Sequence, residues 1–289
     1  MEMGETSLYS PRLEVIVNIE EVQPAHCFAR AQRVLGEIQN LKTEMGRPED
    51  TRSIPEITNA QPRECYFAAL TLWNKTERLA GEIGVAISRV LPRCPSPKDA
   101  RPGHVLQLID GVLSQLDEIR HALHVEERAK EPAIDSSKTP TDVFATLVRA
   151  NRAISRLLER PFTPSDVYRS VALASAYANQ LGGRIVAAPF ERGRRPADCY
   201  AQLERCLNLV TGLIAKQNQP HMTMRGTPAD VVPGDCYDLA QLIVGELAYL
   251  HSLGSSAAVQ PFDSAGSTHR LPSHVHQLAH ILEAQLVVL

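Results

Sequence analysis

The sequence predicts an all-α fold built from eight amphipathic helices. Three observations carry this prediction: a short segment that opens with proline recurs eight times, an apolar pattern of helical period follows each copy, and segments rich in Pro, Gly and Ser separate the copies. The copies begin at Pro24, Pro62, Pro102, Pro140, Pro164, Pro196, Pro233 and Pro272. Their spacings of 38, 40, 38, 24, 32, 37 and 39 residues define a degenerate repeat of about 38 residues.

The apolar pattern is the same in every copy. When the proline is counted as zero, positions 3, 7, 10, 14 and 17 are apolar, and Thr76 is the one polar residue among the forty. Alternating steps of four and three residues place such side chains on one stripe of a helix, here called the seam. Each helix is therefore expected to cover about 20 residues, or about 30 Å at a rise of 1.5 Å per residue.

Each copy also carries the signals of a helix start. Proline suits the first helical position because its missing N–H has no intrahelical partner there. Two positions later, five copies carry Asp or Glu, whose carboxylate can accept hydrogen bonds from the free N–H groups of the first turn. His26, His104 and His274 take that position in the other copies, and we expect them to cap the helices as neutral imidazoles.

The connections divide the chain unevenly. Little more than ERPFT joins the fourth copy to the fifth, whereas every other connection is long. This asymmetry predicts an N-terminal extension (1–23) and two tandem four-helix units, 24–160 and 161–289. The alternative is a continuous α-solenoid, in which each helix packs on its sequence neighbours. Because a 14-residue connection can span about 30 Å, parallel and antiparallel neighbours both stay open.

Short motifs inside the connections suggest order. Phe follows Pro at Phe162, Phe190 and Phe262, and we expect these rings to pin their loops onto the helices. The segment LEVIVNIEE, residues 13–21, alternates weakly and is a candidate edge strand.

Composition excludes several classes of protein. Lys and Arg number 30 against 33 Asp and Glu, so the net charge is -3, which argues against nucleic acid as the main partner. No apolar run reaches the 18 residues that a membrane span needs. The N-terminal residues lack the features of a secretory signal, so the sequence as written predicts a cytoplasmic protein, or a periplasmic one if an export signal has been removed.

The cysteines and the missing motifs argue against catalysis. Cys27, Cys65, Cys199 and Cys236 occupy position 3, where the other copies carry Val, so they are expected to pack as small apolar side chains. No CxxC, GxxxxGK[ST], strand-associated GxGxxG or GxSxG motif occurs. We therefore expect neither an enzyme nor a bound cofactor.

Two clusters are candidate binding sites. Arg192, Arg194 and Arg195 lead into a helix start, with Arg184 nearby, which suggests an anionic ligand or the acidic patch of a partner; simple solvation is the alternative. The second cluster lies near the C-terminus, where His276 and His280 are four residues apart on one helix. They can clasp a metal ion together with His269 or His274, although a polar helix face explains the same pattern.

Repeat regularity, balanced charge and the missing catalytic motifs favour a non-enzymatic helical scaffold or adaptor that binds a protein partner or self-associates as a homo-oligomer. The alternative is a helical module that binds a small molecule or an anion at converging helix N-termini.

Overall fold

The computed structural model describes residues 19–48, 51–87, 90–92, 94–254, 259 and 269–289. Its helices are α1 (Pro24–Glu44), α2 (Pro62–Ile83), α3 (Pro102–Ala122), α4 (Pro140–Ser155), α5 (Pro164–Gln180), α6 (Pro196–Lys216), α7 (Pro233–Gly254) and α8 (Pro272–Val287). The 3-10 turn η1 (Pro97–Asp99) and the strands β1 (Glu56–Thr58) and β2 (Thr223–Arg225) complete the regular structure of these ranges. The all-α prediction is confirmed, and each of these helices begins at its predicted proline. Most of the candidate strand at residues 13–21 lies outside the described residues.

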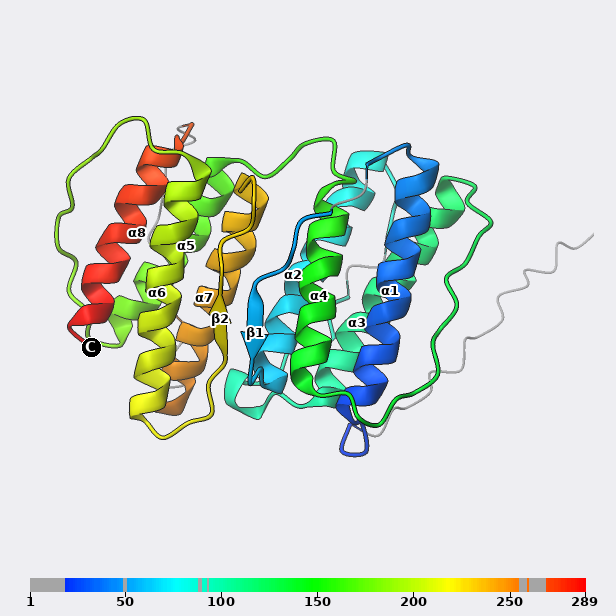
Figure 1. Cartoon of the computed structure of the whole chain (residues 1–289), viewed down its shortest axis with the longest axis horizontal. Coiled ribbons are helices and arrows are strands. Elements are labelled where there is room, and N and C mark those ends of the chain that lie inside the picture. Colours follow the sequence, from blue (N-terminus) through cyan, green and yellow to red (C-terminus); the bar gives the residue numbers. More distant parts are fainter. Residues whose placement is uncertain (1–18, 49–50, 88–89, 93, 255–258, 260–268) are drawn as a thin grey trace, which may run out of the picture.

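The helices pack as two sets of four (Figure 1). In the first bundle α1 and α2 each contact both α3 and α4, and in the second bundle α5 and α6 each contact both α7 and α8. This differs from a solenoid, in which α1 would pack on α2. Helices α1 and α2 instead occupy diagonal corners of the first bundle, as α3 and α4 do.

All four helices of a bundle run in the same direction. At the start of the first bundle, the Cys27 thiol donates to the carbonyl of Pro102, and the Cys65 thiol donates to that of Pro140, both at 3.2 Å. The Cys199 thiol makes the same contact with Pro272 in the second bundle, also at 3.2 Å. Helix starts therefore lie side by side, and each connection inside a bundle must run back along a whole helix. This requirement explains the long connections.

The short connection from α4 to α5 needs no such return. It passes from the end of α4 directly to the start of α5, so the second bundle runs antiparallel to the first (Figure 1). The sequence left helix direction open, and the structure resolves it.

The seam forms the core of both bundles. All but three of the forty seam positions are buried, and Thr76, the polar exception, donates to the carbonyl of Leu72 at 2.9 Å. The three half-buried positions are Leu181, Leu213 and Leu289 in the last layer of the second bundle. Since each buried Leu, Ile or Val contributes about 1.5–3 kcal/mol, the seam is the main source of stability.

The expected caps are present. The carboxylate of Glu64 accepts from the N–H of Gln61 at 2.7 Å, and four other helices repeat this contact with Asp. Nδ1 of His26, His104 and His274 accepts from the corresponding backbone N–H at 3.0–3.1 Å. These three imidazoles therefore cap their helices where the other copies use a carboxylate, as expected.

Helices α2 and α7 join the two bundles, and the connections add a strand pair. Strand β1 pairs with β2 in antiparallel orientation, with Ile57 opposite Met224. At the end of this ladder the hydroxyls of Thr58 and Thr223 lie 2.6 Å apart.

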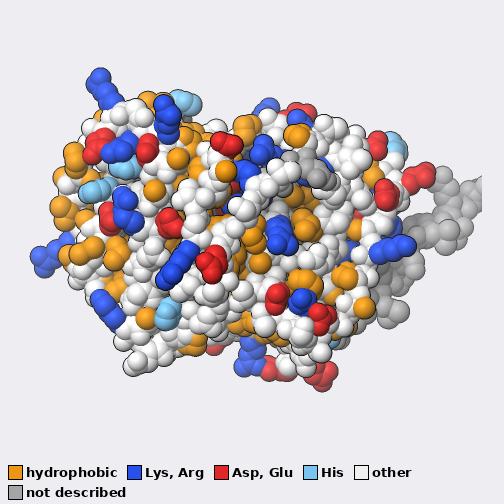
Figure 2. Space-filling view, viewed as in Figure 1, with side chains coloured by type: hydrophobic (Ala, Val, Ile, Leu, Met, Phe, Trp, Pro, Cys, Tyr) orange, Lys and Arg blue, Asp and Glu red, His pale blue; other side chains and the backbone are white. Residues whose placement is uncertain are grey.

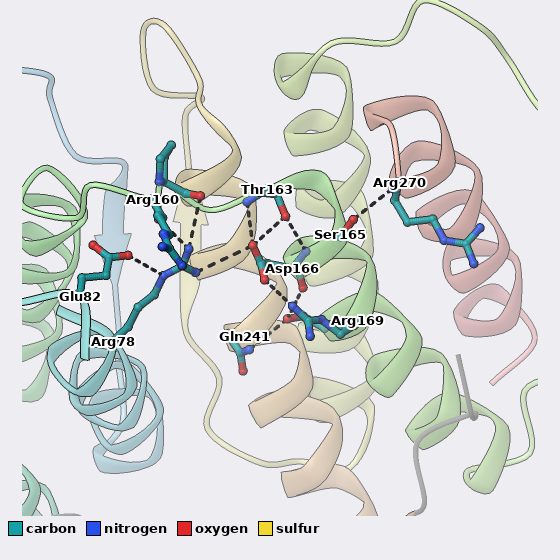
Figure 3. A network of polar contacts seen from close by, with 11 residues as sticks. Arg78, Glu82, Arg160, Thr163, Ser165, Asp166, Arg169, Gln241 and Arg270 are labelled. Atoms are coloured by element: carbon teal, nitrogen blue, oxygen red, sulfur yellow. Dashed lines mark hydrogen bonds and ion pairs between the residues drawn. The ribbon is translucent and has the colours of Figure 1, made fainter. Parts of the chain in front are cut away.

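Arg78 of α2 holds the connection between the bundles (Figure 3). Its Nη2 donates to the carbonyl of Arg160 at 2.6 Å, its Nη1 lies 3.8 Å from the carboxylate of Asp166, and its guanidinium lies 4.6 Å from the centre of the Phe162 ring. Phe162 is buried and stacks on Tyr237 at 4.2 Å, as expected for a pinned loop.

The other two expected pins differ from Phe162. Phe190 contacts His274 but stays 43% exposed, so it covers its helix only partly. Phe262 lies outside the described residues.

Candidate functional site

The structure does not bring the four predicted arginines to one site. Arg184 lies just beyond the end of α5, whereas Arg192, Arg194 and Arg195 lie at the start of α6. Because α5 and α6 are parallel, these positions belong to opposite ends of the bundle. Arg194 forms ion pairs with Glu191 and Asp198, and the other three side chains are exposed.

The four histidines have separate surroundings. His274 caps α8, and His280 is half exposed and lies 3.8 Å from Glu283. His276 is buried, and burial lowers its pKa. His269 is exposed. Among the described residues, no group of three or more His, Cys, Asp and Glu side chains is placed to hold a metal ion.

The cysteines are buried at the helix starts, as expected. Desolvation raises the pKa of Cys27 and of Cys199 to about 12, and it also raises that of Cys65 and Cys236. A thiol with a raised pKa is a poor nucleophile at neutral pH.

The first bundle carries a basic groove. It lies between α1, α4 and residues 52–54, and it encloses about 550 Å³. Four cationic side chains line it, and its lining holds no Asp or Glu among the described residues. The four cations are Lys42, Arg52, Arg149 and Arg152. Lys and Arg side chains gather on this face where the chain leading to β1 crosses α4 (Figure 2).

Lys42 is the most unusual of these cations. It follows the seam residue Leu41 directly, so α1 carries its side chain into the bundle surface, and only 2% of the residue is exposed. Within the part of the chain that the structure describes, its ammonium group has one hydrogen-bond partner, the amide oxygen of Gln39 at 3.4 Å. Lys42 is one of the residues that line the groove, so a bound anion would give its ammonium group an ionic partner.

The arginines come from two elements. Arg152 of α4 is 7% exposed and donates to the carbonyl of Ser53 at 2.8 Å, which fixes the loop wall of the groove. Arg149, one helical turn earlier, is exposed at the rim. Arg52 and Arg152 both reach a carboxylate of the second bundle: Asp235 lies 2.7 Å from Arg52 and 3.6 Å from Arg152.

The balance of charge favours an anion. The described lining holds four cationic side chains and no Asp or Glu, and Asp235, which lies outside that lining, pairs with two of the four. Guanidinium groups bind carboxylate and phosphate oxygens in a bidentate manner, and the amides of Gln32 and Gln39 add neutral donors. The described lining holds no Cys, His or carboxylate, and its one hydroxyl side chain is that of Ser53.

Sequence reasoning missed this site. Lys42, Arg149 and Arg152 lie beside the seam in their copies, and each alone is an ordinary cation on a helix. Arg52 lies in a long connection, and no local signal places it across α4. A signal appears only once α1 and α4 are known to be parallel neighbours, because their positions can then be aligned.

No family model, curated protein or solved structure gives a significant match to this chain. Among the described residues, no helix combines the length and the apolar character that crossing a membrane requires.

Proposed function

We propose that this protein is a non-enzymatic binding module that takes a small anionic molecule in the basic groove. The observation that carries the proposal is the set of four cationic side chains that line the groove with no Asp or Glu in its described lining, Lys42 being the most buried of the four. A ligand with phosphate or carboxylate groups would supply the missing charge.

The dimensions favour a small molecule over a polyanion. Small-molecule sites enclose roughly 300–1,000 Å³, and the groove lies within that range. The chain as a whole carries a net charge of -3, so the positive charge is local and a long nucleic acid would meet acidic surface outside it.

Calorimetric titration with inorganic phosphate, citrate and succinate tests the proposal. We expect at least one of these anions to bind, and we expect Lys42→Met to weaken binding about tenfold or more because it removes the buried charge and keeps the apolar stem. Arg195→Gln is the matched control, since it removes a cation from the predicted helix-start cluster and should leave binding unchanged.

Two results would overturn the proposal. One is the absence of binding by every anion of the series at low ionic strength, where screening is weakest. The other is equal binding by the wild type and Lys42→Met.

A scaffold that self-associates is the second candidate function, and one observation favours it. Ile185, Val186, Val287 and Val288 are all more than half exposed. They gather at the far end of the second bundle, because a Cβ on Gly183 would lie 2.9 Å from the backbone of Gln285. Uncovered apolar side chains at one end favour association with a second copy.

Light scattering at several concentrations tests this candidate. A dimer that Val287→Asp dissociates would support it, with Val90→Asp as a control at an exposed apolar residue of the first bundle. A monomer at all concentrations would count against self-association.

A further inference from the structure

We infer that Asp235 of α7 is a tethered competitor for the groove, so that a bound anion and the contact between the two bundles oppose each other. The inference rests on the proposed function and concerns the regulation of the same site. It assigns to the second bundle a carboxylate that holds two of the four groove cations when no ligand is bound.

Asp235 contacts two of the four cations that line the groove. Its Oδ2 lies 2.7 Å from Nη1 of Arg52, and its Oδ1 lies 3.6 Å from Nε of Arg152. Only 5% of the residue is exposed, so solvent screens these contacts weakly. A phosphate or carboxylate ligand seeks the same guanidinium groups, and Asp235 satisfies part of their hydrogen-bonding capacity in advance.

The negative charge of Asp235 also opposes that of a bound anion. A ligand in the groove would contact the same two arginines that Asp235 contacts, and two anions held this close repel each other through a partly buried medium. Each guanidinium that turns toward the ligand turns away from Asp235. The ligand therefore binds more weakly than it would without this carboxylate.

Arg52 links the groove to the joint between the bundles. Arg52 also donates to the carbonyl of Asp230 at 3.3 Å, and the chain continues from Arg52 into β1, which pairs with β2. Residues 52–58 thus form one wall of the groove and a strap to the second bundle. Coupling between the two contacts is reciprocal. An anion that draws Arg52 away from Asp235 weakens the attachment of residues 52–58 to the second bundle, and the contact between the bundles weakens anion binding by the same free energy.

Phosphate titration of the full chain provides the test. Asp235→Asn removes the charge, and its amide oxygen can still accept the capping bond from Val232, which Asp235 accepts at 2.9 Å. We expect this variant to bind inorganic phosphate about five- to tenfold more tightly than the wild type.

Two neighbouring variants separate competition from a general effect of charge. Asp230→Asn removes a carboxylate from the same turn, where the backbone rather than the side chain contacts Arg52. Asp198→Asn removes the equivalent capping carboxylate of α6. We expect both to change phosphate affinity less than twofold. An increase with Asp230→Asn equal to that with Asp235→Asn would overturn the inference.

Hydrogen exchange adds a readout of the joint. Saturating phosphate should speed exchange at residues 56–58 and 223–225 in the wild type, and it should have little effect there in Asp235→Asn. Slower exchange at these amides in the wild type would overturn the inference.

The outcomes separate the two proposals. Wild-type binding that Asp235→Asn fails to tighten removes the inference and leaves the proposed function intact. No phosphate binding by either protein counts against both.

Discussion

Lys75 of α2 and Asp238 of α7 form an ion pair across the boundary between the two bundles, with 2.5 Å between Nζ and Oδ1. Lys75 is fully buried and also donates to the carbonyl of Asn151 and the hydroxyl of Ser155, both at 2.9 Å. Burial lowers the pKa of Lys75 and raises that of Asp238, and their mutual attraction opposes both shifts. The pair and the two further hydrogen bonds of Lys75 tie α2, α4 and α7 together.

Removing one member of this pair should destabilise the protein more than removing both. We expect Lys75→Met to lower the free energy of unfolding by about 2–4 kcal/mol, because Asp238 loses its partner near the boundary. Adding Asp238→Leu should recover part of that loss. Urea denaturation measures both effects.

The control for this prediction is an ion pair at the protein surface. Arg205 lies 3.2 Å from Glu283 and is mostly exposed, so Arg205→Gln should change stability by less than about 1 kcal/mol. If Lys75→Met costs no more than this control, the buried pair does not stabilise the joint.

A second buried cluster makes the joint sensitive to pH. Arg63 lies 2.8 Å from Glu64 and 3.4 Å from Glu246, and all three side chains are buried. Burial raises the pKa of both carboxyl groups, and the charge of Glu246 raises that of Glu64 further. One arginine faces two carboxyl groups, so the cluster is neutral when the carboxyls share one proton.

The sign of the pH effect follows from these raised pKa values. Above the unfolded pKa of about 4.3, the folded state holds more protons than the unfolded state, so stability falls as pH rises. Relative to the wild type, Glu246→Gln should flatten the dependence of the unfolding free energy on pH between pH 5 and 8. Glu283→Gln, a control at a partly buried carboxylate of α8 away from the joint, should keep the wild-type dependence, and equal slopes for all three proteins would refute this role of the pair.

Local chemistry explains why the helices could be predicted so fully. Each begins at a proline with a capping Asp, Glu or His two positions later, and the seam decides which face is buried. Both signals are contained in one copy of the repeat. The helices of the folded protein follow these two signals because no tertiary contact opposes the local preference.

The arrangement of the bundles has no comparable local signal. Arg63, Lys75 and Glu246 are polar residues off the seam, and a sequence interpretation assigns such residues to solvent. They are buried because α2 packs on α7, a contact between elements more than 150 residues apart. The basic groove was missed for the same reason, since the direction of α1 relative to α4 decides whether Lys42 and Arg152 share a surface.

Thiol reactivity should follow burial. Cys94 is exposed, whereas the other five cysteines are buried. Titration of the native protein with a disulfide reagent should therefore modify about one thiol rapidly, and denaturation should release the other five. Cys94→Ser should abolish the rapid phase, and rapid modification of a second thiol would contradict the burial of the helix starts.

Two glycines in helices should respond to alanine with opposite signs. A Cβ on Gly245 of α7 would lie 2.3 Å from the ring of Phe67 on α2, so alanine there must displace the ring or separate the bundles. No heavy atom lies within 4 Å of a Cβ on Gly212 of α6, and that residue is exposed. In a helix, alanine is more favourable than glycine by about 0.5–1 kcal/mol at both sites, so the difference between the two variants isolates the steric effect.

We expect Gly212→Ala to raise the free energy of unfolding by about that amount and Gly245→Ala to lower it by about 1–3 kcal/mol. Urea denaturation in which Gly245→Ala matches Gly212→Ala would show that α2 and α7 do not approach as closely as the structure places them.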